Sequence, residues 1–261
     1  MLGKLLKHEF KATSRLLLPL FLILAVLTIM DRIVLGLNVF EGIFATISGF
    51  ITFAYVISII AVVVVTTVFV IYRFYKNLMT DEGYLMFTLP VKPSELINSK
   101  LLVATLWTIV STIAILLSLI IVFSGTSYFP EIKDGFALVF EQISLQLGSY
   151  ANLFYIELFV LIIVSIINNI LMVYVSIAIG QLINGHKILG SIGAYIVISV
   201  IIQIVSVVAL GVFSLILGRT IENVSALPQI LFPLVIIGLV VTNILYYWGT
   251  NFLFKRKLNL D

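Results

Sequence analysis

Four amide side chains interrupt the long apolar runs of this chain and could do polar chemistry at membrane depth. They are Asn168, Asn169, Gln203 and Asn243. Inside a bilayer, amides hydrogen-bond to neighbouring helices for about 0.6 to 2 kcal/mol each, or they line a substrate path. Adjacent helical positions lie about 100° apart. Asn168 and Asn169 therefore cannot both face the same partner, and one of them could face a cavity.

Ionisable side chains are scarce in the same apolar runs. Asp31, Arg32 and Glu157 fall near the predicted outer ends of their spans, where water can reach them. The adjacent Asp31 and Arg32 suggest a local ion pair or a contact to another helix. Transport driven by a proton or sodium gradient usually needs a charged or strongly polar group at mid-depth. If this chain moves a substrate, we expect its energy to come from elsewhere.

Signatures of catalysis and nucleotide binding are missing from the sequence. It contains no HExxH, no GxSxG and no P-loop, and its two histidines, His8 and His186, both fall at the predicted cytoplasmic boundary. Without cysteine, thiolate metal sites and disulfides are excluded. We predict that the chain is not an enzyme, holds no cofactor or metal of its own, and has no nucleic-acid partner.

The longest polar-rich segment between two apolar runs is residues 73–100, RFYKNLMTDEGYLMFTLPVKPSELINSK. Thr80 is an N-cap candidate followed by two carboxylates, which predicts a short helix. Pro90 and Pro93 end this helix, and Ser94 with Glu95 starts the next. An exposed apolar cluster rimmed by charge is typical of a docking element; folding back onto the membrane surface is the alternative. The candidate docking residues are Asp81, Glu82, Gly83, Tyr84, Leu85, Met86 and Phe87.

The composition predicts that the remaining residues form an all-α integral membrane protein. Of 261 residues, 62% are hydrophobic and 10% charged, against about 25% charged in a soluble domain. Six apolar runs have the length of a membrane-spanning helix, about 20 residues. They cover residues 16–37, 43–72, 101–123, 152–184, 191–217 and 229–254, with a tight, basic turn at Gly185–Gly190 and a tail at 255–261. The loop at 124–150 is predicted to hold a short helix on the outer surface.

Residues 1–15 have the pattern of an amphipathic helix lying in the membrane interface. Leu2, Leu5, Leu6 and Phe10 share one face, and Lys4, Lys7, His8, Lys11 and Arg15 share the other. A basic flank that only sets topology is the alternative. With the N-terminus inside, twelve of the fifteen Lys and Arg residues fall on the inner side and three on the outer side. Both termini and residues 73–100 are therefore predicted to be cytoplasmic.

The phrase DEGYLMFTLPVKPSELINSKLL, preceded by RFYKNL, resembles the loop between spans two and three in ABC transporter permeases of the type 2 export class. The likeness is specific at Asp81 to Pro90 and extends loosely to the whole layout, particularly that of small six-span permeases from Gram-positive bacteria. It implies a coupling helix in this loop that sits in a cleft of a separate ABC ATPase, which binds the ATP and magnesium. It also implies a second permease copy or a paralogue.

The resemblance makes the expected function export across a bacterial cytoplasmic membrane. Exporters of antimicrobial peptides or phenol-soluble modulins are similar arrangements, and apolar, charge-poor spans suit an amphipathic or hydrophobic substrate. In this reading Asn168, Asn169, Gln203 and Asn243 are candidates for the substrate path. The alternative is a non-transporting assembly or sensor subunit that recruits a partner through its central loop.

Overall fold

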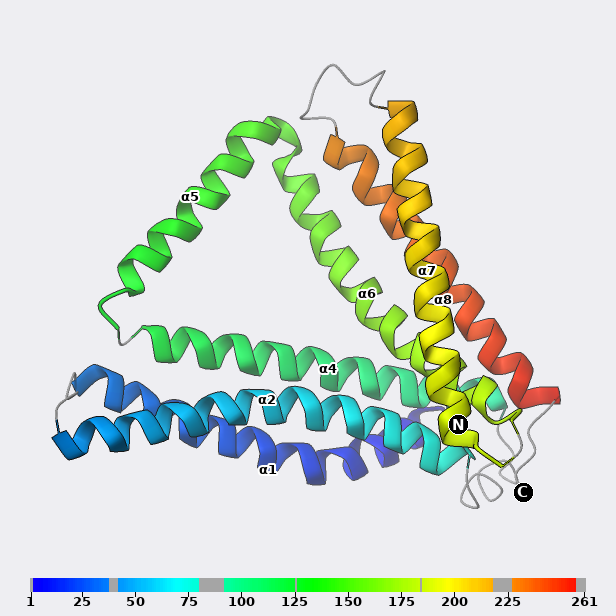
Figure 1. The fold of residues 1–261 in the computed structure, drawn as a ribbon, viewed down its shortest axis with the longest axis horizontal. Helices are drawn as coiled ribbons and strands as arrows, with labels where there is room; N and C mark the ends of the chain where they lie inside the picture. The colour runs from blue at the N-terminus through cyan, green and yellow to red at the C-terminus, as the bar shows by residue number, and fades with distance from the viewer. Residues whose placement is uncertain are drawn as a thin grey trace. The chain divides into compact units, whose positions relative to one another are not determined.

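Every element of the described chain is a helix. A computed structural model describes residues 2–37, 42–79, 92–124, 126–183, 185–217 and 227–256. The elements are α1 (Leu2–Leu37), α2 (Gly42–Met79), α4 (Pro93–Phe123), α5 (Phe129–Leu147), η1 (Gly148–Tyr150), α6 (Ala151–Gly180), α7 (Lys187–Leu217) and α8 (Leu227–Arg256) (Figure 1). Six helices in these ranges are long and apolar enough to cross a membrane. The prediction of an all-helical chain with six helices long and apolar enough to span a membrane is therefore confirmed for the described residues.

The ends of several helices differ from the predicted ones. Helix α1 runs without a break from Leu2 to Leu37, so residues 2–15 belong to the same helix as the first span. Helix α6 ends at Gly180 and α7 begins at Lys187. The connection between them therefore begins and ends earlier in the chain than the predicted turn at Gly185–Gly190. Gly185 has a φ of 88°, and a Cβ on Gly180 would overlap the backbone of Ser191. Gly185 lies in the turn between the two helices, and its positive φ is a conformation that favours glycine.

The chain divides into two compact units. Unit 1 contains Met1–Tyr72 and Asn98–Phe140, and unit 2 contains Arg73–Ile97 and Glu141–Asp261. In unit 1, helices α1, α2 and α4 lie side by side (Figure 1). Its core consists of two clusters of buried residues, which are Leu17, Val103 and Trp107, and Leu24, Tyr55, Val62 and Val122.

Unit 2 is organised around α6, which packs against both α7 and α8. Apart from Ala151, the buried residues of α6 lie in its C-terminal half, from Ile170 to Gly180. Helix α7 contributes almost nothing to the interior, because none of its most apolar 18-residue stretch is buried. Apolar surface of this kind is stable only against lipid or another protein.

Candidate functional site

The seven predicted docking residues, Asp81, Glu82, Gly83, Tyr84, Leu85, Met86 and Phe87, lie outside the described residues. The structure does describe the two helical stems on either side of them. Helix α2 leads into this segment at Met79, and α4 leaves it at Pro93. Glu95 lies in the first turn of α4, and its N–H donates to the Lys92 carbonyl at 2.9 Å. The predicted helix start at Ser94 and Glu95 is therefore confirmed to within one residue.

Both stems are anchored by fully buried apolar side chains. Phe74 and Leu78 in the last turns of α2 are 0% exposed, and Leu96 and Ile97 in the first turns of α4 are 1% and 0% exposed. All four belong to unit 2. Side chains packed this closely do not shift independently of their neighbours. A displacement of the segment between the stems would therefore be passed to the rest of unit 2.

Phe74 makes the most specific contact of the stems. Its ring stacks on Tyr174 of α6, with 3.6 Å between ring centroids and 11° between ring planes. It also stacks on Phe254 of α8, at 5.9 Å and 22°. Stacked aromatic pairs contribute about 0.5–1.5 kcal/mol beyond the area they bury. One side chain thus joins the stem of the predicted docking segment to two helices of unit 2 that are long and apolar enough to cross a membrane.

An open hollow of about 470 Å³ lies beside the same stem. It is lined by Tyr75 of α2 and by the Gly185–Leu189 stretch that begins α7. The Gly190 N–H donates to the His186 carbonyl at 2.8 Å, an i to i−4 bond in the first turn of α7. The basic residue Lys187 lines the hollow, next to the stem of the predicted docking segment.

Two of the four predicted path residues meet in a single polar contact between α6 and α8. The Asn168 amide donates to Thr242 Oγ1 at 2.7 Å and to Asn243 Oδ1 at 2.9 Å. The Asn243 amide in turn donates to the Val164 carbonyl at 3.3 Å. These bonds match the alternative in which the amides hold helices together.

The other two predicted path residues lie apart from this contact. Asn169 and Gln203 are both exposed, on α6 and α7. In the described ranges, no side-chain hydrogen bond is formed by either. Asn169 projects from a different side of α6 than Asn168, because successive side chains are about 100° apart around the helix axis. Asn169 and Gln203 are therefore the amides available to a substrate, to lipid or to another chain.

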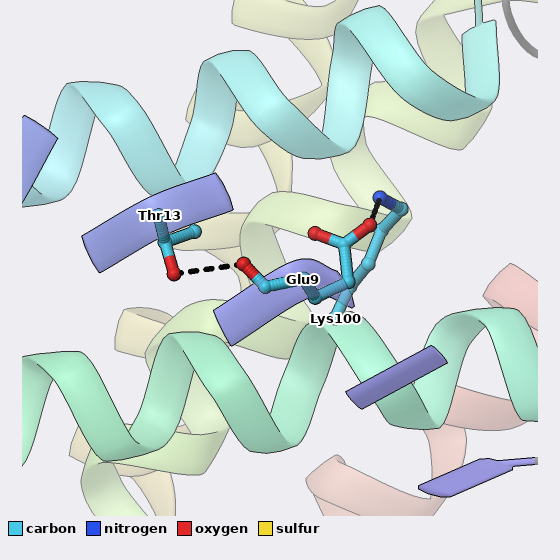
Figure 2. Close-up of polar contacts among 3 residues, drawn as sticks. All are labelled: Glu9, Thr13 and Lys100. Atoms are coloured by element: carbon cyan, nitrogen blue, oxygen red, sulfur yellow. Dashed lines mark hydrogen bonds and ion pairs between the residues drawn. The ribbon is translucent and has the colours of Figure 1, made fainter. Parts of the chain in front are cut away.

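Unit 1 contains a buried ion pair that the sequence reading did not anticipate. Lys100 Nζ of α4 lies 2.8 Å from Glu9 Oε1 of α1, and both side chains are at most 9% exposed (Figure 2). Thr13 Oγ1 donates to the Glu9 carbonyl at 2.9 Å and accepts from Trp107 Nε1 at 2.7 Å. Phe10 stacks on Trp107 at 5.1 Å. The N-terminal turns of α1 are thereby fixed to the start of α4.

Further polar contacts follow along the same three helices. Ser118 of α4 bonds to both Thr28 and Tyr55 at 2.8 Å, and Thr66 bonds to Ser111 at 3.0 Å. Thr52 donates to Asp31 Oδ1 at 2.6 Å. Asp31 is only 1% exposed, so the expectation that water reaches it is wrong, because α2 covers it. Of its two predicted contacts, the one to another helix is confirmed.

A positional signal for these contacts exists in the sequence. Lys100, Trp107, Ser111 and Ser118 are separated by seven, four and seven positions, so they share one face of α4. Glu9 and Thr13 share a face of α1 in the same way.

No family model, no curated protein and no solved structure matches this chain. The chemistry of the site therefore rests on the chain's own residues.

Proposed function

We propose that this chain is the permease subunit of an ATP-driven exporter, coupled to a separate ABC ATPase through Asp81–Phe87. The observation that supports this most directly is the anchoring of both stems. Phe74, Leu78, Leu96 and Ile97 are fully buried in unit 2, and Phe74 stacks on α6 and α8. A segment that only recruits a partner needs no such connection to membrane-spanning helices.

The distribution of charge in the described helices favours an external energy source. The Glu9–Lys100 pair lies near the N-terminal ends of α1 and α4, and Asp31 lies near the opposite end of α1. The polar groups at the middle of α6 and α8 are the neutral amides Asn168 and Asn243. Neutral amides do not gain or lose a proton, so proton-coupled transport finds no carrier there.

The proposal includes the partners and location that the family resemblance implies. The ATPase binds ATP and magnesium, and the permease pairs with a second copy or a paralogue in a bacterial cytoplasmic membrane. Both termini and the docking segment face the cytoplasm. The substrate is an amphipathic or hydrophobic molecule, with a peptide as the leading candidate. The exposed apolar surface of α7 leaves room for a second copy.

The test is reconstitution of the permease with a candidate ABC ATPase. Inside-out vesicles should take up labelled amphipathic peptide only with ATP, and uptake should persist when an ionophore collapses the proton gradient. The matched control is the permease alone with an imposed pH or sodium step. Uptake driven by that step would contradict the proposal. Absence of a copurifying ATPase would favour the recruiting subunit instead.

A further inference from the structure

A groove of about 630 Å³ runs between α1 and α4 in unit 1. Leu6 and Phe10 line it from α1, and Leu102, Leu106 and Val110 line it from α4. All five positions lie at intervals of four residues along their own helix, so they form one continuous stripe on each helix. Between two helices that are long and apolar enough to cross a membrane, a groove with these walls has the polarity that suits a lipid acyl chain.

One end of the groove carries a positive charge. Lys7 is the charged residue of its lining, and it is exposed, with no acidic partner among the described residues. Lys4 and Lys11 lie three and four positions away on the same face of α1 and are also exposed. The nearest carboxylate along the helix, Glu9, is buried against Lys100. The groove therefore presents a cation at its mouth and no competing anion.

We propose that this groove is a binding site for one anionic phospholipid. Its phosphate lies at Lys7, and an acyl chain follows Leu102, Leu106 and Val110. Basic pockets between helices at the cytoplasmic side are the kind of site that binds anionic headgroups. The proposal depends on membrane insertion and on the charged end facing an anionic leaflet, but not on ATP-driven export.

Trp107 provides a local reporter for the groove. It is 4% exposed and stacks on Phe10 of the groove wall, so bulk lipid does not reach it. The only other tryptophan, Trp248, is 63% exposed and is removed by Trp248→Phe. This single-tryptophan protein is reconstituted in phosphatidylcholine containing either brominated phosphatidylglycerol or brominated phosphatidylcholine, whose bromines quench indole at short range.

Brominated phosphatidylglycerol should quench Trp107 at lower mole fraction than brominated phosphatidylcholine. Lys7→Gln should reduce that preference about fivefold, since one lysine at an anionic surface contributes about 1 kcal/mol. Lys11→Gln is the matched control: it removes the same charge from the same face without lining the groove, and should change the preference less than twofold. Val110→Phe should reduce quenching by both lipids. Equal quenching by the two headgroups, or equal loss with Lys7→Gln and Lys11→Gln, would overturn the proposal.

Discussion

The two units hold their helices together by different means. In unit 1, polar side chains connect α1, α2 and α4 at successive levels, from the Glu9–Lys100 pair to the contact between Asp31 and Thr52. In unit 2, the described contacts between helices include one amide contact, of Asn168 with Asn243. They also include ring contacts, namely the stack on Phe74 and the edge-to-face pair of Phe154 with Phe232.

This difference suggests a division of roles within the proposed exporter. Hydrogen bonds at many levels of a helix bundle fix the relative position of its members, because each bond resists sliding and rotation. Ring contacts fix the relative position of helices less tightly than directional hydrogen bonds do. We therefore expect unit 1 to behave as a rigid frame and unit 2 to move when the docking segment is displaced.

The largest expected effect comes from breaking the buried ion pair of unit 1. Lys100→Met leaves the Glu9 carboxylate buried without its 2.8 Å partner, which should destabilise the protein by about 3 to 5 kcal/mol. Unfolding in mixed micelles by titration with SDS measures this cost. The double variant Glu9→Leu with Lys100→Met is the control and should recover most of the loss. Equal stability of Lys100→Met and the wild type would show that unit 1 is not fixed by this pair.

Truncating the aromatic anchor of unit 2 should have the next largest effect. Phe74→Ala removes both ring contacts from a fully buried site, at a cost of about 3 kcal/mol. Phe74→Leu keeps most of the volume and should lose about 1 kcal/mol, the contribution of stacking alone. The proposed function adds a second readout. Phe74→Leu should leave ATPase capture unchanged and lower the transport obtained per ATP. Unchanged transport per ATP would show that the Phe74 contacts do not couple ATP hydrolysis to transport.

The smallest of these effects is expected for the amides of α6. Asn168→Ala loses its two hydrogen bonds to α8 and should cost about 0.6 to 2 kcal/mol. Asn169→Ala, one residue away and exposed, is the matched control and should change stability by less than about 0.5 kcal/mol. Its effect should instead fall on substrate handling. A larger stability loss for Asn169→Ala than for Asn168→Ala would reverse the two roles.

The number and kind of elements could be predicted from the sequence, because runs of about 20 apolar residues have few other stable arrangements. Helix ends were harder to place. Helix α1 continues through Arg15, since nothing between the basic stretch and the first span breaks a helix. The helix start at Pro93 was predictable to within one residue, because proline is favoured in the first turn.

The candidate site was predicted only in part. The meeting of Asn168 with Asn243 depends on which faces of α6 and α8 pack together, which a single sequence does not specify. The Glu9–Lys100 pair joins residues 91 positions apart. Lys100 was counted only among the basic residues of the inner side, and Glu9 was assigned no role. The burial of Phe74 was not predicted, because this residue lies in the polar-rich stretch 73–100. Residues Asp81 to Phe87 stay a prediction.

The most direct test of the account is whether those residues bind the ATPase. Truncating aromatic side chains that fill a cleft should remove a contact worth about 2 kcal/mol or more and weaken assembly over tenfold. The measurement is capture of the ATPase by purified Tyr84→Ala with Phe87→Ala, checked first for a single monodisperse peak, with Asn169→Ala as the control. We predict that the double variant loses capture and that Asn169→Ala retains it. Normal capture and normal export by the double variant would contradict the account and move the coupling element to the Gly185–Leu189 recess or to the basic N-terminal turns of α1.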